Sequence, residues 1–452
     1  MTRSADAAAP RLILTGSLPL RLLTLVLFYF TQGFPIGLFF FALPAWMASH
    51  GVGTAGIASV VATSSLPWTL KFVNGFLVDR YTFLPMGRRR IWIIGAQGLV
   101  VLSLLGGALI APLPTDVATI AALGFCANTA VTFQDAGIDS LAIDIMPEDE
   151  RARAGGIMAG AQIVGISLTT AAGGWLLTRY GIGPSLVVLA AMPALVMLYA
   201  VLIRERQGER RLPWSRGASH PANAAIQIEA WWPLLVGATR AVEAPVSLLL
   251  VPVLFVRAIP DGAHEAFLPV LFHDWLGWSP ADYTGFTSSV LLASGLAGML
   301  VGGWAVERIG AQRAVTLALG IVAATTTAFA LAYPLWHEPR VVIGMYIVME
   351  VARVTFFIAA LTLAMRICNP SVAATQFTIY MAISNFGRPT GAALAASTAG
   401  AGHPQTLYIG LAAIAGLALL LVLKVTYPAE NRAQHVLAEE LPQAEGPAPE
   451  FE

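Results

Sequence analysis

The amino-acid sequence predicts an all-α polytopic membrane protein with twelve membrane-spanning helices. Of its 452 residues, 57% are hydrophobic and only 12% are charged, whereas a soluble globular protein carries about 25% charged residues. The hydrophobic residues gather in repeated runs of about 20, the length at which a helix crosses the hydrocarbon core of a bilayer. Both observations favour a helical membrane protein over a soluble one.

The apolar runs form two groups of six expected spans. The first run begins after Arg21 and is too long for the apolar part of a signal peptide, so we interpret it as a retained span. Residues 1–203 form the predicted N-terminal half, with spans at 21–48, 54–79, 90–111, 115–140, 152–178 and 183–203. Residues 246–427 form the predicted C-terminal half, with spans at 246–275, 281–306, 312–334, 340–367, 371–399 and 405–427.

A polar segment, 204–245, separates the two halves and is predicted to be a cytoplasmic linker. Its first part holds five arginines, and its second part, Trp231 to Glu243, is expected to be a short interfacial helix with Trp231 and Trp232 at headgroup depth. The last segment, 428–452, is rich in Glu, Pro and Ala, a composition typical of a disordered tail.

Basic residues alternate between the loops and predict the orientation. One set of loops holds only Arg179 and Arg340. The other set and the linker hold nearly all the remaining arginines: Arg80, Arg88, Arg89, Arg90, Arg151, Arg153, Arg204, Arg206, Arg210, Arg211, Arg216, Arg308, Arg313 and Arg366. Because basic loops stay on the cytoplasmic side, both termini and the linker are predicted to be cytoplasmic.

An internal repeat predicts that the two halves are pseudo-symmetric. After the second span, residues 74–80 end in Asp79-Arg80 and a Gly-Arg-Arg-Arg run follows at 87–90; after the eighth span, residues 302–308 end in Glu307-Arg308 and Arg313 follows. A duplicated acid–arginine turn fits two parallel six-helix repeats. This layout resembles the major facilitator superfamily, and the turns resemble its loop 2–3 motif. We expect the turns to hold the cytoplasmic side closed and to orient the loops, with the gating residues Asp79, Arg80, Arg88, Arg89, Glu307, Arg308 and Arg313.

Three stretches resemble the AmpG family of muropeptide permeases. They are Gln32-Gly33-Phe34-Pro35 in the first span, Phe133-Gln134-Asp135 with Asp139 in the fourth, and Ser384-Asn385-Phe386-Gly387-Arg388 in the eleventh. The resemblance implies proton-driven import of a large polar solute through the bacterial inner membrane. Siderophore and acetyl-CoA-type permeases of the same clan are the alternatives. The substrate stays open, because Ala142 and Ile163 stand where the muropeptide branch has a Lys and an Arg.

Asp135 and Asp139 are the strongest candidates for proton coupling. They are spaced i, i+4 and therefore lie on one helix face, about 6 Å apart. Two carboxylates this close in a low-dielectric cavity do not both ionise readily, so one is expected to hold a proton near neutral pH. The alternative is a structural ion pair with an arginine of a neighbouring span. Lys71, two turns before Asp79, is expected to extend to the cytoplasmic interface.

The seventh span carries a second group of charges along one stripe. Arg257, Asp261, His264 and Glu265 are expected to bind substrate, and Pro260 and Gly262 predict a break in this helix, where backbone groups become available to a solute. The alternative is a structural salt bridge between Arg257 and Asp261, in which the two side chains neutralise each other and do not contact a solute.

Three further charges fall inside spans of the C-terminal half. Glu350 is assigned to proton coupling. Arg353 is expected to bind substrate, and because it lies one turn after Glu350 the two could instead neutralise each other. Arg388 is expected to bind an anionic group bidentately. Its alternative role is a bridge to Asp135, Asp139 or Glu350 from another helix.

Five amides inside the spans are the remaining candidates for substrate contact. Buried amides need hydrogen-bond partners, which a water-filled cavity or a solute can supply. These amides are Gln32, Gln134, Gln162, Gln376 and Asn385.

Other functional classes find little support. The sequence holds no nucleophile–base or zinc motif of an enzyme and no P-loop, and its two cysteines have no metal-ligand spacing. A non-transporting membrane sensor, the distant alternative, would add a long soluble domain. We therefore expect no enzyme activity, cofactor or metal. The expected partners are a small solute, protons and membrane lipid; zero net charge argues against nucleic acid, and a monomer is expected.

Overall fold

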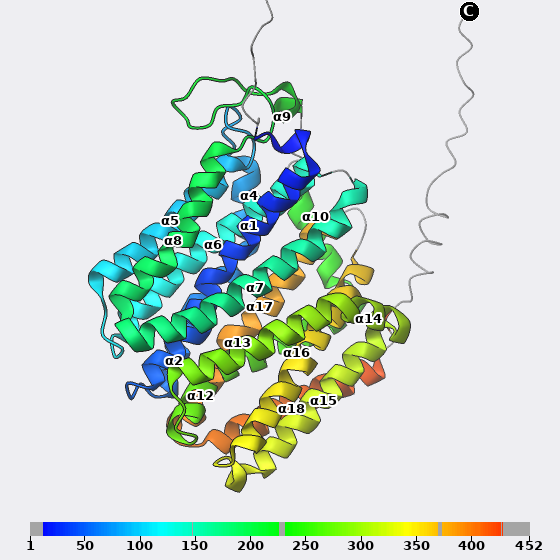
Figure 1. Ribbon diagram of the computed structural model, residues 1–452. Coiled ribbons are helices and arrows are strands. Elements are labelled where there is room, and N and C mark those ends of the chain that lie inside the picture. The colour runs from blue at the N-terminus through cyan, green and yellow to red at the C-terminus, as the bar shows by residue number, and fades with distance from the viewer. Residues whose placement is uncertain (1–11, 147, 226–230, 369–372, 426, 428–452) are drawn as a thin grey trace, which may run out of the picture.

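The computed structural model describes residues 12–146, 148–225, 231–368, 373–425 and 427, and the secondary structure of these residues is helical (Figure 1). The predicted disordered tail, 428–452, lies outside the described residues. So do the side chains of Trp231 and Glu307.

The N-terminal half consists of six helical units in chain order. The first is α1 (Leu18–Gly37), continued by the π-helical segment η2 (Leu38–Ala42) and α2 (Leu43–Ala48). The second is α3 (Thr54–Thr69) with α4 (Lys71–Arg80). The others are α5 (Arg90–Ile110), α6 (Val117–Ile145), α7 (Glu148–Tyr180) and α8 (Ile182–Leu202).

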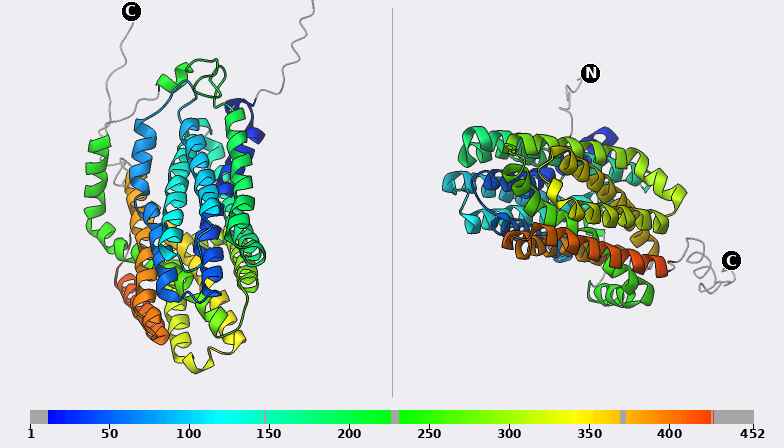
Figure 2. Two further views of the ribbon diagram at one scale, coloured as in Figure 1. Left: turned by 90° about the vertical axis from the view of Figure 1, so that its left-hand side faces the viewer. Right: turned by 90° about the horizontal axis from the view of Figure 1, so that it is seen from below.

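The C-terminal half repeats this order. Its units are α11 (Pro245–Arg257) with α12 (Ile259–Asp274), α13 (Pro280–Ala297) with the π-helical η3 (Gly298–Gly302) and α14 (Gly303–Ile309), then α15 (Ala311–Leu331), α16 (Pro339–Ile367), α17 (Ala373–Ser397) and α18 (Pro404–Lys424). Between the halves lie α9 (Pro221–Ala225) and α10 (Trp231–Glu243), and α10 packs along α17 at the edge of the bundle (Figure 2).

Ten helical segments in the described part of the chain are long and apolar enough to cross a membrane, so the chain is a multi-pass membrane protein. Apolar side chains also cover its outer surface: Leu109 is 88% exposed and Leu300 is 80% exposed. The other two expected spans correspond to α3 with α4, and to α17, and neither is among the ten. The number twelve therefore stays a prediction.

The second helix of each repeat departs from regular α-helical geometry at a matching position, by a break in the N-terminal half and by a π-helical segment in the C-terminal half. The helix α3 ends before Leu70, nine residues before Asp79, and η3 begins at Gly298, nine residues before Glu307. Local departures from α-helical geometry often mark functional segments. In the seventh unit, the predicted break is confirmed at Ala258, two residues before Pro260.

Glu205 joins the start of the linker to the N-terminal half. Its buried carboxylate accepts hydrogen bonds from the backbone N–H groups of Arg88, Arg89 and Arg90 at 2.8, 2.8 and 2.9 Å. Burial raises the pKa of this carboxyl group above its usual value, while the three backbone donors act in the opposite direction. The fully buried Arg90 donates to the carbonyl oxygens of Ala200 at the end of α8, among others. We call the end of the bundle that carries residues 204–225 the linker side and the opposite end the far side.

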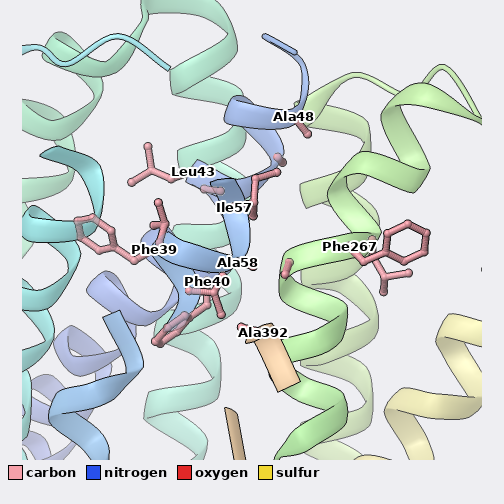
Figure 3. Close-up of a cluster of buried hydrophobic side chains, with 14 of the residues drawn as sticks. Phe39, Phe40, Leu43, Ala48, Ile57, Ala58, Phe267 and Ala392 are labelled. Atoms are coloured by element: carbon pink, nitrogen blue, oxygen red, sulfur yellow. The ribbon is translucent and has the colours of Figure 1, made fainter. Parts of the chain in front are cut away.

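The two halves meet in an apolar cluster toward the far side. Phe39, Phe40, Leu43, Ile57 and Ala58 of the N-terminal half lie in one buried cluster with Phe267 and Ala392 of the C-terminal half (Figure 3). Further out, a Cβ atom on Gly400 would lie 3.1 Å from the Cβ of Ala55. On this side the halves are in close van der Waals contact.

Candidate functional site

Four residues of the N-terminal half form what we call the N-terminal charge cluster: Tyr29, Lys71, Asp135 and Asp139. The Lys71 ammonium pairs with Asp135 and lies 3.4 Å from Oδ2 of Asp139. The Tyr29 hydroxyl donates a hydrogen bond to Asp139. The Asp135 side chain is 5% exposed, whereas those of Lys71 and Asp139 are 26% and 42% exposed. The cluster is thus buried at Asp135 and accessible at Asp139.

The expectation that Lys71 extends to the membrane interface is wrong. Lys71 is the first residue of α4, directly after the break at Leu70, and its ammonium lies between the two carboxylates of α6. The reason is energetic, because two intramembrane carboxylates without a counter-ion cost far more than one lysine held inside the bundle. The sequence did contain a signal for this ion pair, because an intramembrane cation lies in the same half as two intramembrane acids.

Three predicted amides lie near this cluster with partners inside the protein. Gln162 Nε2 donates to Gln32 Oε1 at 2.8 Å. Gln134 Nε2 donates to the Phe28 carbonyl oxygen at 3.1 Å. Gln32 and Gln134 are fully buried, so neither presents surface to a solute in this conformation, whereas Gln162 is partly exposed.

Six residues on three units of the C-terminal half form what we call the C-terminal charge cluster. Asp261 is its centre: its carboxylate oxygens lie 3.6 to 3.9 Å from nitrogens of Arg257, Arg353 and Arg388. Arg388 also lies 3.6 Å from Glu265, and Arg353 pairs with Glu350. The members are Arg257, Asp261, Glu265, Glu350, Arg353 and Arg388.

Close backbone packing places Arg388 in this cluster. A Cβ atom on Gly262 would collide with the carbonyl oxygen of Arg388, and one on Gly391 would collide with that of Ile259. Only glycine allows α12 and α17 to approach this closely. Arg388 therefore bridges to Asp261 and Glu265, and the alternative of a bridge to Asp135, Asp139 or Glu350 is wrong.

The acids of the C-terminal cluster are buried and two of its arginines are accessible. The Asp261 and Glu265 side chains are 3% and 6% exposed, whereas those of Arg353 and Arg388 are 28% and 24% exposed. Arg257 is held inside by a 2.6 Å hydrogen bond from its Nε to Ser384 Oγ. The accessible surface of this cluster is therefore mainly cationic.

His264, Gln376 and Asn385 lie outside both charge clusters. His264 stacks on Tyr408 with ring centres 5.8 Å apart. Gln376 donates to the Tyr380 hydroxyl at 2.8 Å. Asn385 Nδ2 donates to the carbonyl oxygen of Trp68 at 3.2 Å and so joins α17 of one half to α3 of the other.

The predicted gating residues are arranged differently in the two halves. Arg89 pairs with Asp79 at 2.5 Å and with Asp144 at 2.9 Å, and Arg88 lies 3.5 Å from Asp144. All four belong to the N-terminal half. Arg80 and Arg313 are exposed, Arg308 stacks on the Trp304 ring at 4.5 Å, and Glu307 lies outside the residues whose side chains are described. Their gating role stays a prediction.

Comparisons with known proteins agree with this architecture. The structure superposes on that of a bacterial homolog of the human lysosomal transporter Spinster with a TM-score of 0.68, at 15% identity, over 95% of this chain and 100% of the other. It superposes on the nucleoside transporter NupG with a TM-score of 0.66, at 14% identity, over 89% and 98% of the two chains. These likenesses concern the fold.

Two similar sequences are transporters. The anhydromuropeptide permease of Escherichia coli is 24% identical over 413 residues, which cover 89% of this chain and 79% of the permease. The folate-biopterin transporter of Synechocystis sp. is 25% identical over 392 residues, which cover 82% of this chain and 74% of the transporter. The family model described as Major Facilitator Superfamily matches residues 25–392. The chain belongs to the major facilitator superfamily, as an AmpG-like permease, and is a membrane transporter rather than an enzyme.

Proposed function

We propose that the protein is a proton-coupled transporter that imports a polar, anionic solute through the bacterial inner membrane. One observation carries this proposal: in the N-terminal charge cluster, Asp135 and Asp139 share Lys71 as their counter-ion. In the C-terminal cluster, three arginines face three carboxylates. The first cluster therefore has one negative charge in excess and the second has none.

An excess carboxylate inside a membrane protein favours uptake of a proton, because an uncompensated charge is costly there. Asp139 is the more accessible of the two acids and carries the Tyr29 hydrogen bond as well as the lysine contact. We assign the exchanging proton to the Asp135–Asp139 pair. Glu350 is paired with Arg353 and accepts from Ser294 at 3.3 Å, so it takes part in coupling only if a solute displaces that arginine.

The solute is proposed to bind at Arg353 and Arg388. Their guanidinium groups are partly exposed while the acids behind them are buried, an arrangement that offers forked donors to a carboxylate. Muropeptides and folates both carry carboxylates. An anhydromuropeptide-like solute is our first candidate and a folate-like pteridine is the second, because the two named relatives are about equally similar to this chain.

The linker side is assigned to the cytoplasm by its arginines. The halves pack together on the far side, where Phe40 and Phe267 share one buried cluster and Gly400 lies against Ala55. This packing supports a conformation closed toward the periplasm, with the solute pathway leading to the cytoplasm. Alternating access then requires the far-side contacts to open.

Transport in sealed vesicles tests the proposal. Labelled anhydromuropeptide or folate is supplied with an imposed pH gradient, with and without a protonophore. Wild-type protein is expected to accumulate one of them, and only with the gradient. Asp139→Asn is expected to lose accumulation but to keep solute exchange at equal concentrations, because exchange needs no net proton movement.

Asp274→Asn, a change of the same chemistry at an exposed position on the far side, serves as the matched control and is expected to accumulate solute normally. Accumulation by wild type that survives the protonophore, or by Asp139→Asn at the wild-type level, would remove proton coupling. Loss of accumulation in Arg388→Gln but not in Arg340→Gln would support the proposed anion site.

A further inference from the structure

A groove on the linker side of the C-terminal half belongs to neither charge cluster. Its volume is about 770 Å³, and it lies between the start of α15 and the ends of α16 and α18. Three arginines line it: Arg308 and Arg313, which are both exposed, and Arg366. The groove is therefore strongly basic.

The walls of the groove are apolar and continue onto the lipid-facing surface. Leu317 of α15 and Leu423 of α18 line it and are 56% and 62% exposed. Gln312 fixes the two walls together, because its Nε2 donates to the carbonyl oxygens of Val422 and Val425 at 3.2 and 2.6 Å. The groove thus offers cationic groups at one end and aliphatic groups toward the bilayer.

The equivalent place in the N-terminal half is occupied by a carboxylate. The third helix of that half, α5, starts at Arg90, and Glu205 accepts hydrogen bonds from the backbone N–H groups of residues 88–90. The third helix of the C-terminal half, α15, starts after Gly310 without a side-chain cap. A helix start of this kind favours an anion, and here the arginines of the groove surround it.

We propose that this groove binds an anionic phospholipid from the leaflet on the linker side. Its phosphate lies between Arg308, Arg313 and the start of α15, and its acyl chains lie along Leu317 and Leu423. Basic pockets between membrane helices are suited to acidic headgroups. The charge balance agrees, since Arg308, Arg313 and Arg366 leave this end cationic even when Glu307 is counted in the sequence.

A lipid explains the groove better than a free anion does. A single phosphate or carboxylate would satisfy the arginines but leave the aliphatic walls uncovered. The groove is also much larger than one such group. The rival occupant is the acidic segment 428–452 of this chain, which follows the groove-lining Tyr427 in the sequence.

Native mass spectrometry of the purified full-length protein tests this site. The protein in neutral detergent is mixed with phosphatidylglycerol or with phosphatidylcholine, and bound lipid is counted. Wild type is expected to prefer phosphatidylglycerol. R308Q/R313Q is expected to bind phosphatidylglycerol roughly 30-fold more weakly, because each of the two arginines near the membrane surface contributes about fivefold to the affinity. Equal binding by wild type and this variant overturns the proposal.

Two matched variants show whether charge or folding is responsible. R308K/R313K keeps the positive charges and is expected to bind phosphatidylglycerol within about threefold of wild type. R179Q/R340Q removes the same charge from the far-side loops and is expected to bind as wild type does. A loss as large as that of R308Q/R313Q in the far-side variant would mean non-specific attraction and would overturn the site.

Two further arms distinguish the possible occupants. Inorganic phosphate added at the lipid concentration is expected to leave bound phosphatidylglycerol unchanged; complete displacement by it would reduce the site to a phosphate site and overturn the lipid proposal. Deletion of residues 428–452 is expected to leave lipid binding unchanged. If deletion raises it more than about tenfold, the tail occupies the groove and the proposal is wrong.

Discussion

Arg388 of α17 lies over the ring of Phe40, with its guanidinium carbon 4.6 Å from the ring centre, and the two residues belong to opposite halves of the chain. The same arginine contacts Asp261 and Glu265. Because a residue of the C-terminal charge cluster thus touches the π-helical segment η2, opening of the far side must break a contact made at the proposed solute site. This geometry couples the site to the interface between the halves.

Replacing Phe40 tests that coupling. A cation–π contact contributes about 0.5–2 kcal/mol, so Phe40→Leu is expected to shift the population about 2- to 30-fold toward conformations open on the far side. Distances between spin labels at His50 and Asp274, which are exposed near the far ends of α2 and α12, measure the shift. Phe41→Leu is the control, because it removes the same side-chain volume at the adjacent position. Identical distance distributions in wild type and Phe40→Leu would contradict the expectation.

We expect Lys71 to contribute to stability only as the counter-ion of Asp135 and Asp139. Lys71→Met leaves the buried Asp135 without its partner, and breaking a buried pair costs about 3–5 kcal/mol, with the lower end expected here because Lys71 is 26% exposed. The melting temperature, followed by size-exclusion chromatography, should fall markedly. It should recover when Asp135→Asn is added. Strictly additive effects of the two changes would show that they do not interact.

Asp261 should matter more for folding than Glu350 does. Asp261→Asn removes the carboxylate shared by Arg257, Arg353 and Arg388, whereas Glu350→Gln affects chiefly Arg353. Each unpaired buried cation lowers the free energy of unfolding. We therefore expect Asp261→Asn to destabilise the protein by about 2 kcal/mol or more beyond the effect of Glu350→Gln. Thermal unfolding in detergent measures this. The reverse order would mean that Asp261 is not the centre of the cluster.

Alanine substitutions at Gly87 and Gly208 distinguish the cost of backbone strain from the cost of a steric collision. Both adopt positive φ, +99° and +86°, but a Cβ atom at Gly87 would also run into the Glu205 carboxylate, whereas Gly208 faces open space. Gly208→Ala is expected to cost about 1–2 kcal/mol from the left-handed backbone alone. Gly87→Ala should cost clearly more, as a larger fall in melting temperature. Equal losses would mean that Glu205 adjusts without cost.

The membrane class followed from composition, and the positions of most helices followed from the apolar runs. The break in the seventh span was also predictable, because Pro260 and Gly262 weaken a helix locally. The break at Leu70 and the π-helical segments η2 and η3 were not predicted, although Pro67 lies three residues before Leu70 and Pro35 and Pro44 lie on either side of η2. The polar α17 was expected as a span but is not among the ten apolar segments.

The sequence by itself predicted most of the charges that lie inside the bundle, with Lys71 as the exception, because a carboxylate or a guanidinium in an apolar run is visible without any structure. Asp135, Asp139, Asp261 and Glu350 were all found in this way. Only the tertiary structure decided which of them pair. Lys71 joins Asp135 across two helices, and Arg388 joins Asp261 because glycines bring α12 and α17 together. Ion pairing depends on distances between helices, and these are set by the shapes of packed side chains rather than by spacing along the chain.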